Sequence, residues 1–119
     1  MLSPEIKSYF CTDIDNIETW FPHDPEYVSF WIDVIIGLKG SDAGDNFQVH
    51  VVTQKQLSQI ENKEYLLIIP YFENIEKVIE LLNKTIKECK GINWAGVSID
   101  LSKKYLWDYH DFPNKTNLI

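Results

Sequence analysis

The sequence predicts an α+β fold: a single domain in which an antiparallel or mixed β-sheet with a central hairpin carries helices mainly on one face. Two stretches between residues 28 and 52 have apolar side chains at every second position, which predicts the hairpin. Apolar residues at helical spacing from Ile75 to Cys89 predict a long amphipathic helix. A chain of 119 residues has the length of one domain, so we expect residues 1–119 to fold as a unit.

The chain is expected to begin with a strand and then to turn into a rigid loop. Residues 6–12 have the character of a short strand, and residues 12–15 offer a capping pattern for a single helical turn. The segment Phe21-Pro22-His23-Asp24-Pro25 is not helical, because two closely spaced prolines interrupt the backbone hydrogen bonds.

In the hairpin, the apolar residues of both arms must face the same side of the sheet. A four-residue loop from Gly40 to Ala43 meets this condition and places Asp33 opposite His50. These two side chains would form a charged cross-strand pair on the second face of the sheet. Trp31 and Val52 share that face, so we expect it to be half covered.

The remaining elements follow from caps and apolar runs. Residues 53–56 form a capping box that predicts a short helix, and residues 65–69 predict a central strand covered on both faces. The long helix that begins at Ile75 has Gly91 as its C-terminal cap. Residues 94–101 predict a weaker helix, and residues 105–109 predict a last strand at an edge of the sheet.

Charge is distributed unevenly along the chain. Residues 47–104 contain seven acids and eight lysines, which nearly cancel, whereas residues 1–46 contain nine acids and two lysines. The acidic third also contains the aromatic residues Trp20, Phe21, Tyr27 and Trp31. Carboxylates mixed with large aromatic side chains suit a docking surface for a basic partner.

Composition argues against several classes of partner. The net charge is −7 and all eleven basic residues are lysine, so we expect no nucleic acid partner. No apolar segment approaches the ~20 residues of a membrane span, so we expect no membrane partner either. The N-terminus lacks the pattern of a signal peptide, so we expect the protein in the cytoplasm with both cysteines as thiols.

The aspartate and histidine patterns do not predict a metal site. Asp13 and Asp15 are spaced like the start of a calcium loop, but the fifth and sixth positions are then Ile17 and Glu18. The cysteines and histidines lack the spacing of zinc ligands. We therefore expect no metal and no cofactor.

No catalytic motif is present either. Nucleophile elbows, phosphate loops and dinucleotide fingerprints are absent, and Cys89 lies on the apolar stripe of its helix as an inert thiol. We therefore predict a protein that is not an enzyme. A small hydrolase remains as an alternative, and Asp33 with His50 would be its site.

Several segments of the chain resemble the immunity protein 8 family of polymorphic-toxin immunity proteins. The resemblance rests on residues 21–25 leading to Phe30, and on residues 36–40, 45–49 and 52–57. It continues through the long helix, which ends near Gly91, and then through Trp94, Leu101, Trp107 and Tyr109. One departure is Val52-Thr53-Gln54-Lys55-Gln56-Leu57, where family members tend to have Cys-Thr-Pro-Lys-x-Leu. Proline at the first helical position is favourable but dispensable, so this change leaves the fold intact.

The resemblance implies a small cytosolic inhibitor that binds the C-terminal domain of a cognate toxin, frequently a nuclease. Charge placement, rather than the resemblance, selects the candidate partner-binding residues. They are Asp13, Asp15, Glu18, Trp20, Asp24 and Glu26, with Asp42 and Asp45 at the hairpin turn as second choice. The alternative from another class is an interaction or assembly module unrelated to toxins. The oligomeric state stays open.

Overall fold

The computed structural model describes residues 2–107 of the chain. Its elements, in chain order, are β1 (Pro4–Phe10), β2 (Ser29–Leu38), β3 (Asp45–Thr53), the 3-10 turn η1 (Gln56–Gln59), β4 (Leu66–Ile69), α1 (Ile75–Ile86), α2 (Trp94–Ser102) and β5 (Leu106–Trp107). This order confirms the predicted α+β class, the central hairpin and the presence of both predicted helices. The predicted C-terminal cap at Gly91 is wrong, because α1 ends at Ile86 with Lys87 as its C-cap. The predicted continuation of the last strand to Tyr109 lies outside the described residues.

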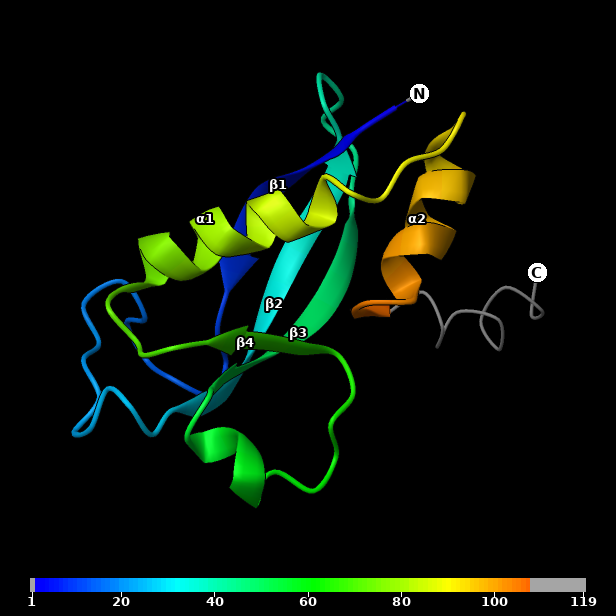
Figure 1. Ribbon diagram of the computed structural model, residues 1–119. Helices are drawn as coiled ribbons and strands as arrows, with labels where there is room; N and C mark the ends of the chain where they lie inside the picture. The colour runs from blue at the N-terminus through cyan, green and yellow to red at the C-terminus, as the bar shows by residue number, and fades with distance from the viewer. Residues whose placement is uncertain (1, 108–119) are drawn as a thin grey trace, which may run out of the picture.

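The sheet is mixed, with strand order β1-β2-β3-β4. β1, β2 and β3 pair antiparallel, whereas β4 runs parallel to residues 50–53 of β3. β5 pairs antiparallel with residues 47 and 48, so β4 and β5 share the same edge of β3. Figure 1 shows α1 lying across the sheet and α2 standing beside β3.

The core lies on the face of the sheet that both helices cover. Alternate residues of β2 and β3 have no exposed surface, and they form one cluster with the buried side chains of α1 and α2. The sheet contributes Ile32, Val34, Ile36, Phe47, Val49 and Val51, and the helices contribute Ile75, Val78, Leu82, Ile86, Val97 and Leu101. Each fully buried side chain of this size contributes about 1.5–3 kcal/mol. The prediction that helices pack mainly on one face is confirmed.

The register of the hairpin differs by two residues from the prediction. Trp31 is opposite His50 and Asp33 is opposite Gln48, so the predicted pair of Asp33 with His50 is wrong. The reason is a longer loop that begins with a turn: the Ser41 N–H donates to the Leu38 carbonyl at 3.0 Å. The apolar faces still match, because a shift of two residues keeps every side chain on its own face.

The corrected register changes the partners of both side chains. His50 stacks on Trp31, with ring centroids 4.7 Å apart and an interplanar angle of 11°. Asp33 Oδ1 accepts hydrogen bonds from Asn46 Nδ2 at 2.9 Å and Gln48 Nε2 at 3.3 Å. The second face of the sheet therefore carries a polar network around Asp33 and a separate ring stack.

Three local predictions are wrong for identifiable reasons. Thr53 does not cap a helix, because its hydroxyl bonds the backbone of Val28, and the short helix is the 3-10 turn η1. Residues 12–15 do not cap a helix, because the Asp13 carboxylate accepts the Trp31 backbone N–H at 3.0 Å. The predicted single turn up to Trp20 does form, and the Trp20 N–H closes it by donating to the Asn16 carbonyl at 2.9 Å. β4 is not covered on both faces, because Ile68 is 44% exposed.

We expect Thr53→Val to lower the free energy of unfolding by about 1–3 kcal/mol. The Thr53 side chain is fully buried, and its Oγ1 accepts the Val28 N–H at 3.0 Å and donates to the Val28 carbonyl at 3.3 Å. Valine fills the space but leaves the Val28 N–H without a partner. Urea denaturation measures the loss. Thr53→Ser, which keeps the hydroxyl, serves as the control and should recover much of the stability.

The first half of the edge strand β1 offers few free backbone donors. The Leu2 N–H donates to the Gly91 carbonyl at 2.9 Å, and the Ile6 N–H faces Asn83 Oδ1 at 3.4 Å. Pro4, between them, has no N–H to offer. This part of the edge is therefore closed to pairing with another strand.

Candidate functional site

The loop between β1 and β2, residues 11–28, lies at one end of the sheet and is fixed there by aromatic packing. Trp20 contacts Phe30 and Phe72 edge-to-face, with ring centroids 6.0 and 5.1 Å apart. The Phe72 N–H donates to the Pro25 carbonyl at 2.8 Å, which joins the loop to the connection between β4 and α1. Trp20 is therefore a half-buried anchor of the loop rather than a free surface residue.

A tight turn orients the end of this loop. Asp24 Oδ1 accepts the Glu26 N–H at 3.0 Å, and the Asp24 carbonyl accepts the Tyr27 N–H at 3.1 Å. Lys55 Nζ lies 3.0 Å from Glu26 Oε2 and 6.0 Å from the centroid of the Tyr27 ring. The hydrogen bond with Glu26 raises the pKa of Lys55. Both charged groups are exposed, so the pair contributes little stability.

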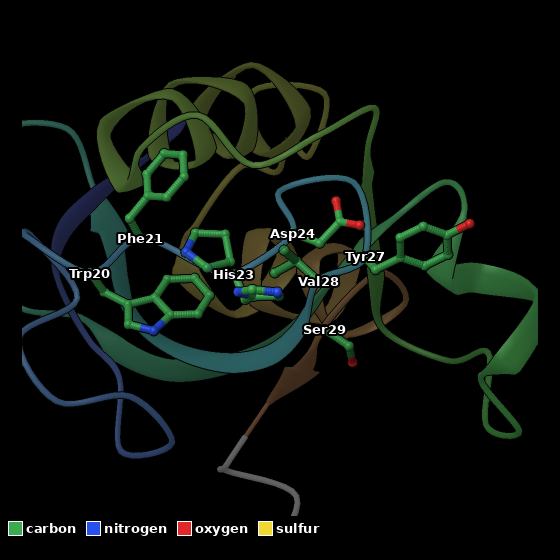
Figure 2. A pocket seen from close by; sticks show the side chains of 8 residues that line it. Trp20, Phe21, His23, Asp24, Tyr27, Val28 and Ser29 are labelled. Carbon is green, nitrogen blue, oxygen red and sulfur yellow. The ribbon is translucent and has the colours of Figure 1, made fainter.

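An open pocket of about 430 Å³ is hollowed into this loop. Figure 2 shows Trp20 and Phe21 on one side and Tyr27 on the other, with His23 and Asp24 between them. Phe21 is 65% exposed and Tyr27 is 49% exposed, although both are large aromatic side chains. Exposed aromatic residues around a hollow are typical of protein interaction sites.

Lysines gather at the other end of the molecule. A hollow of about 730 Å³ between the start of β1, the hairpin loop and the C-terminal half of α1 is lined by Lys39, Lys84, Lys87 and Lys90. Within residues 2–107, these four lysines form no ion pair. The molecule therefore has an acidic loop at one end of the sheet and, at the other end, a hollow lined by four lysines together with Glu5 and Glu80.

A family model described as immunity protein 8 matches residues 4–112, which include every element from β1 to β5. The chain belongs to the immunity protein 8 family. Neither the curated proteins nor the solved structures give a significant match to it. Membership of the family implies that this immunity protein neutralises a cognate toxin, and that it does so without catalysis. The resemblance noted in the sequence is thereby confirmed.

The structure divides the eight candidate binding residues of the immunity protein into two groups. Six lie on the loop of residues 11–28: Asp13, Asp15, Glu18, Trp20, Asp24 and Glu26. Asp42 and Asp45 lie at the hairpin loop, beyond the far end of β2. β2 has 10 residues and spans about 30 Å, so the two groups lie at opposite ends of the sheet (Figure 1).

Two of these candidates have partners inside the protein. Asp13 Oδ2 accepts the backbone N–H of Trp31 at 3.0 Å, and Asp45 Oδ2 accepts the indole N–H of Trp94 at 2.7 Å. The second bond ties the start of β3 to the start of α2. Substituting Asp45 would therefore disturb the packing of α2 as well as any contact with a partner.

Sequence reasoning placed Phe21 and Tyr27 among the aromatic residues of a docking surface, but it did not select them or His23 as binding residues, although all three line the pocket. The available signal was the pair of prolines, Pro22 and Pro25, which stiffens the loop that presents these side chains. Proline spacing predicted a rigid loop, but it could not show that aromatic rings border a hollow.

The structure offers no support for the alternative of a hydrolase at Asp33 and His50. His50 Nε2 lies 2.7 Å from Ser29 Oγ, and its buried Nδ1 has no hydrogen-bond partner among residues 2–107. Among the described residues, no carboxylate forms the hydrogen bond to the imidazole that would orient it as a base. Burial raises the pKa of the Cys11 and Cys89 thiols, which opposes formation of a nucleophilic thiolate.

Metal and membrane sites are absent from the part of the chain that the structure describes. Within residues 2–107, no three His, Cys, Asp or Glu side chains are grouped so that they could hold a metal ion. None of the helices in that range is long and apolar enough to cross a bilayer.

We expect the immunity protein to lose stability as the pH falls below about 6.5, in part through His50. Burial lowers the pKa of His50, and a weaker contribution from Asp13 raises it. An unfolded histidine titrates near pH 6.5, so the unfolded chain binds the proton more tightly than the folded one. The contribution of His50 to the free energy of unfolding is therefore complete above pH 6.5. It is lost as the pH falls from there through the lower pKa that His50 has in the folded protein.

Urea denaturation between pH 5.5 and 7.5 measures this effect. His50→Gln should flatten the dependence on pH, whereas His23→Gln, at an exposed position, should not. Parallel curves for the parent protein and His50→Gln would show that His50 does not carry the effect.

Proposed function

We propose that this immunity protein inhibits a basic nuclease toxin domain in the cytoplasm, and that it binds the domain through the loop of residues 11–28. The observation that carries the proposal is the union, on one ordered loop, of exposed carboxylates with exposed aromatic rings. Asp15, Glu18 and Asp24 are exposed there beside Phe21 and Tyr27. No other part of residues 2–107 combines these two features to the same extent.

The chemistry of a nuclease makes it a fitting partner for such a surface. A nuclease holds phosphates with lysine and arginine, so its substrate-binding face is basic. Opposite charges speed the association of two proteins and select the correct partner. Aromatic residues near the centre of an interface supply much of the affinity. An acidic inhibitor with central aromatic rings can therefore cover the face that nucleic acid would occupy.

The order already present in the loop favours tight binding. Trp20 is packed against Phe30 and Phe72, and the turn from Asp24 to Tyr27 is closed by two hydrogen bonds. A surface that is ordered before binding loses little conformational entropy when it meets its partner. The loop can thus present its carboxylates and rings without rearrangement.

Co-expression with the C-terminal domain encoded by the neighbouring upstream gene tests this function. We expect cell survival, a stable complex on co-purification, and protection of nucleic acid from degradation in vitro. A catalytically inactive toxin variant controls for expression and folding of both proteins. Killing without complex formation would exclude that pair. If the toxin domain kills cells without degrading nucleic acid, the toxin is not a nuclease.

A further inference from the structure

We propose that the pocket lined by Trp20, Phe21, Asp24 and Tyr27 receives an arginine side chain of the partner. The identity of the partner as a basic toxin rests on the proposed function above. The chemistry of the pocket, by contrast, can be tested without any toxin.

The walls of the pocket suit a flat cation. Trp20 and Phe21 border one side of the hollow of about 430 Å³, and Tyr27 borders the other side, where its ring points away from Trp20 (Figure 2). A guanidinium group stacks on such rings through cation–π attraction. The floor near Val28 is apolar and buried, which suits the methylene groups of an arginine.

Asp24 supplies the matching negative charge. Its Oδ1 accepts the Glu26 N–H at 3.0 Å, which fixes the carboxylate at the rim. Its Oδ2 receives no hydrogen bond from any residue in the range 2–107, so it can accept one from a guanidinium. The second carboxylate of the turn, Glu26, already faces Lys55 Nζ at 3.0 Å.

The loop already holds one cation by this combination of groups. Lys55 Nζ lies 3.0 Å from Glu26 Oε2 and 6.0 Å from the centroid of the Tyr27 ring. The pocket repeats the combination with Asp24 and the rings of Trp20 and Phe21. Within residues 2–107 Asp24 forms no ion pair, although its charge acts on Lys55 from a greater distance. The chain contains no arginine, so an arginine in this pocket must come from another molecule.

Arginine fits better than lysine or an apolar anchor. Its planar group can stack on a ring and donate to a carboxylate at the same time, whereas an ammonium is a compact, strongly hydrated charge. A leucine or phenylalanine anchor would use the rings but would leave the Asp24 carboxylate facing apolar surface, which is costly.

A titration followed by NMR tests the pocket directly. The probes are N-acetyl-arginine amide, N-acetyl-lysine amide and N-acetyl-leucine amide, each added to the ¹⁵N-labelled protein. We expect the arginine probe to shift the signals of the Trp20 indole and of residues 21–29, with a Kd in the millimolar range typical of a small weak ligand. We expect the lysine probe to bind at least about threefold more weakly and the leucine probe to cause no shifts.

Variants separate charge from packing. Asp24→Asn keeps the oxygen that accepts the Glu26 N–H but removes the charge. It should lower the affinity for the arginine probe about fivefold or more. Tyr27→Ala should weaken it about threefold. Phe10→Ala, which removes another exposed aromatic ring on β1, is the matched control and should change nothing.

Three results would overturn the inference: no shifts with the arginine probe, equal binding of the leucine probe, or full binding to Asp24→Asn. The second would identify an apolar anchor site instead. If the arginine probe binds as expected but no toxin is neutralised, the pocket assignment holds and the proposed function fails. If a toxin is neutralised while the arginine probe does not bind, the function holds and the pocket assignment is wrong.

Discussion

Reversal of Asp15, Glu18 and Asp24 to lysine should lower the affinity for the toxin domain by about a hundredfold or more. The three carboxylates are exposed on one loop, so the change replaces a negative surface by a positive one that repels a basic partner. Electrostatic attraction acts mainly on the association rate, which steering can change by about 10–1,000-fold. Stopped-flow association at low and physiological salt measures the loss, and the salt dependence of the rate should reverse sign.

Reversal of Glu61, Glu64 and Glu80 to lysine is the matched control. These acids are also exposed, so the two triple variants have the same net charge, −1 by arithmetic from −7 plus 6. An equal loss in both variants would mean that overall charge, rather than the loop, controls association. Unchanged affinity after reversal on the loop would show that the toxin binds elsewhere, and Asp42→Lys at the hairpin loop would then be the next variant.

Gly37→Ala should destabilise the protein by about 3 kcal/mol, near the upper end of the range for overpacking. A Cβ on Gly37 would lie 2.0 Å from the Ala43 carbonyl oxygen and 3.2 Å from Gly44 Cα. These are backbone atoms, so no side-chain rotation relieves the contact and the end of the hairpin must move. For a protein of this size the expected loss corresponds to a fall in Tm of about 10 °C.

Gly40→Ala separates this steric effect from backbone conformation. Gly40 has φ of +85°, but a Cβ there would meet nothing within 4 Å. Its cost is the left-handed conformation alone, about 1–2 kcal/mol. Thermal unfolding of both variants should therefore give the larger fall for Gly37→Ala. The reverse order would mean that the hairpin end yields easily and that the conformation of Gly40 limits stability.

The periodicity of apolar residues in the sequence predicted most of the fold. The stripe from Ile75 to Ile86 is the buried face of α1, and the alternation in β2 and β3 correctly sorted their side chains between the two faces. The pairing register of β2 with β3 could not be predicted from this periodicity. Alternation fixes only whether the shift is odd or even, whereas the length of the loop depends on the turn that Gly40 permits and on the close approach of Gly37 to Ala43.

The candidate site was predictable where the residues are adjacent in sequence. Six of the eight candidates share a loop because they fall within fourteen residues of chain, from Asp13 to Glu26. The hydrogen bonds that Asp13 and Asp45 accept within the protein could not be predicted from the sequence. Their partners, Trp31 and Trp94, are 18 and 49 residues away. The position of Trp20 between Phe30 and Phe72 likewise depends on contacts that only the folded chain brings about.

The closed start of β1 has a consequence for how such an antidote is kept. A cell that carries a toxin depends on a standing reserve of free inhibitor, held ready before any toxin molecule arrives. Molecules stored side by side at high concentration can stack through open strand edges into fibrils. With Leu2 and Ile6 already bonded and Pro4 between them, the first half of this edge gives a growing fibril no template. Stacking of stored molecules through this part of the sheet edge is therefore blocked.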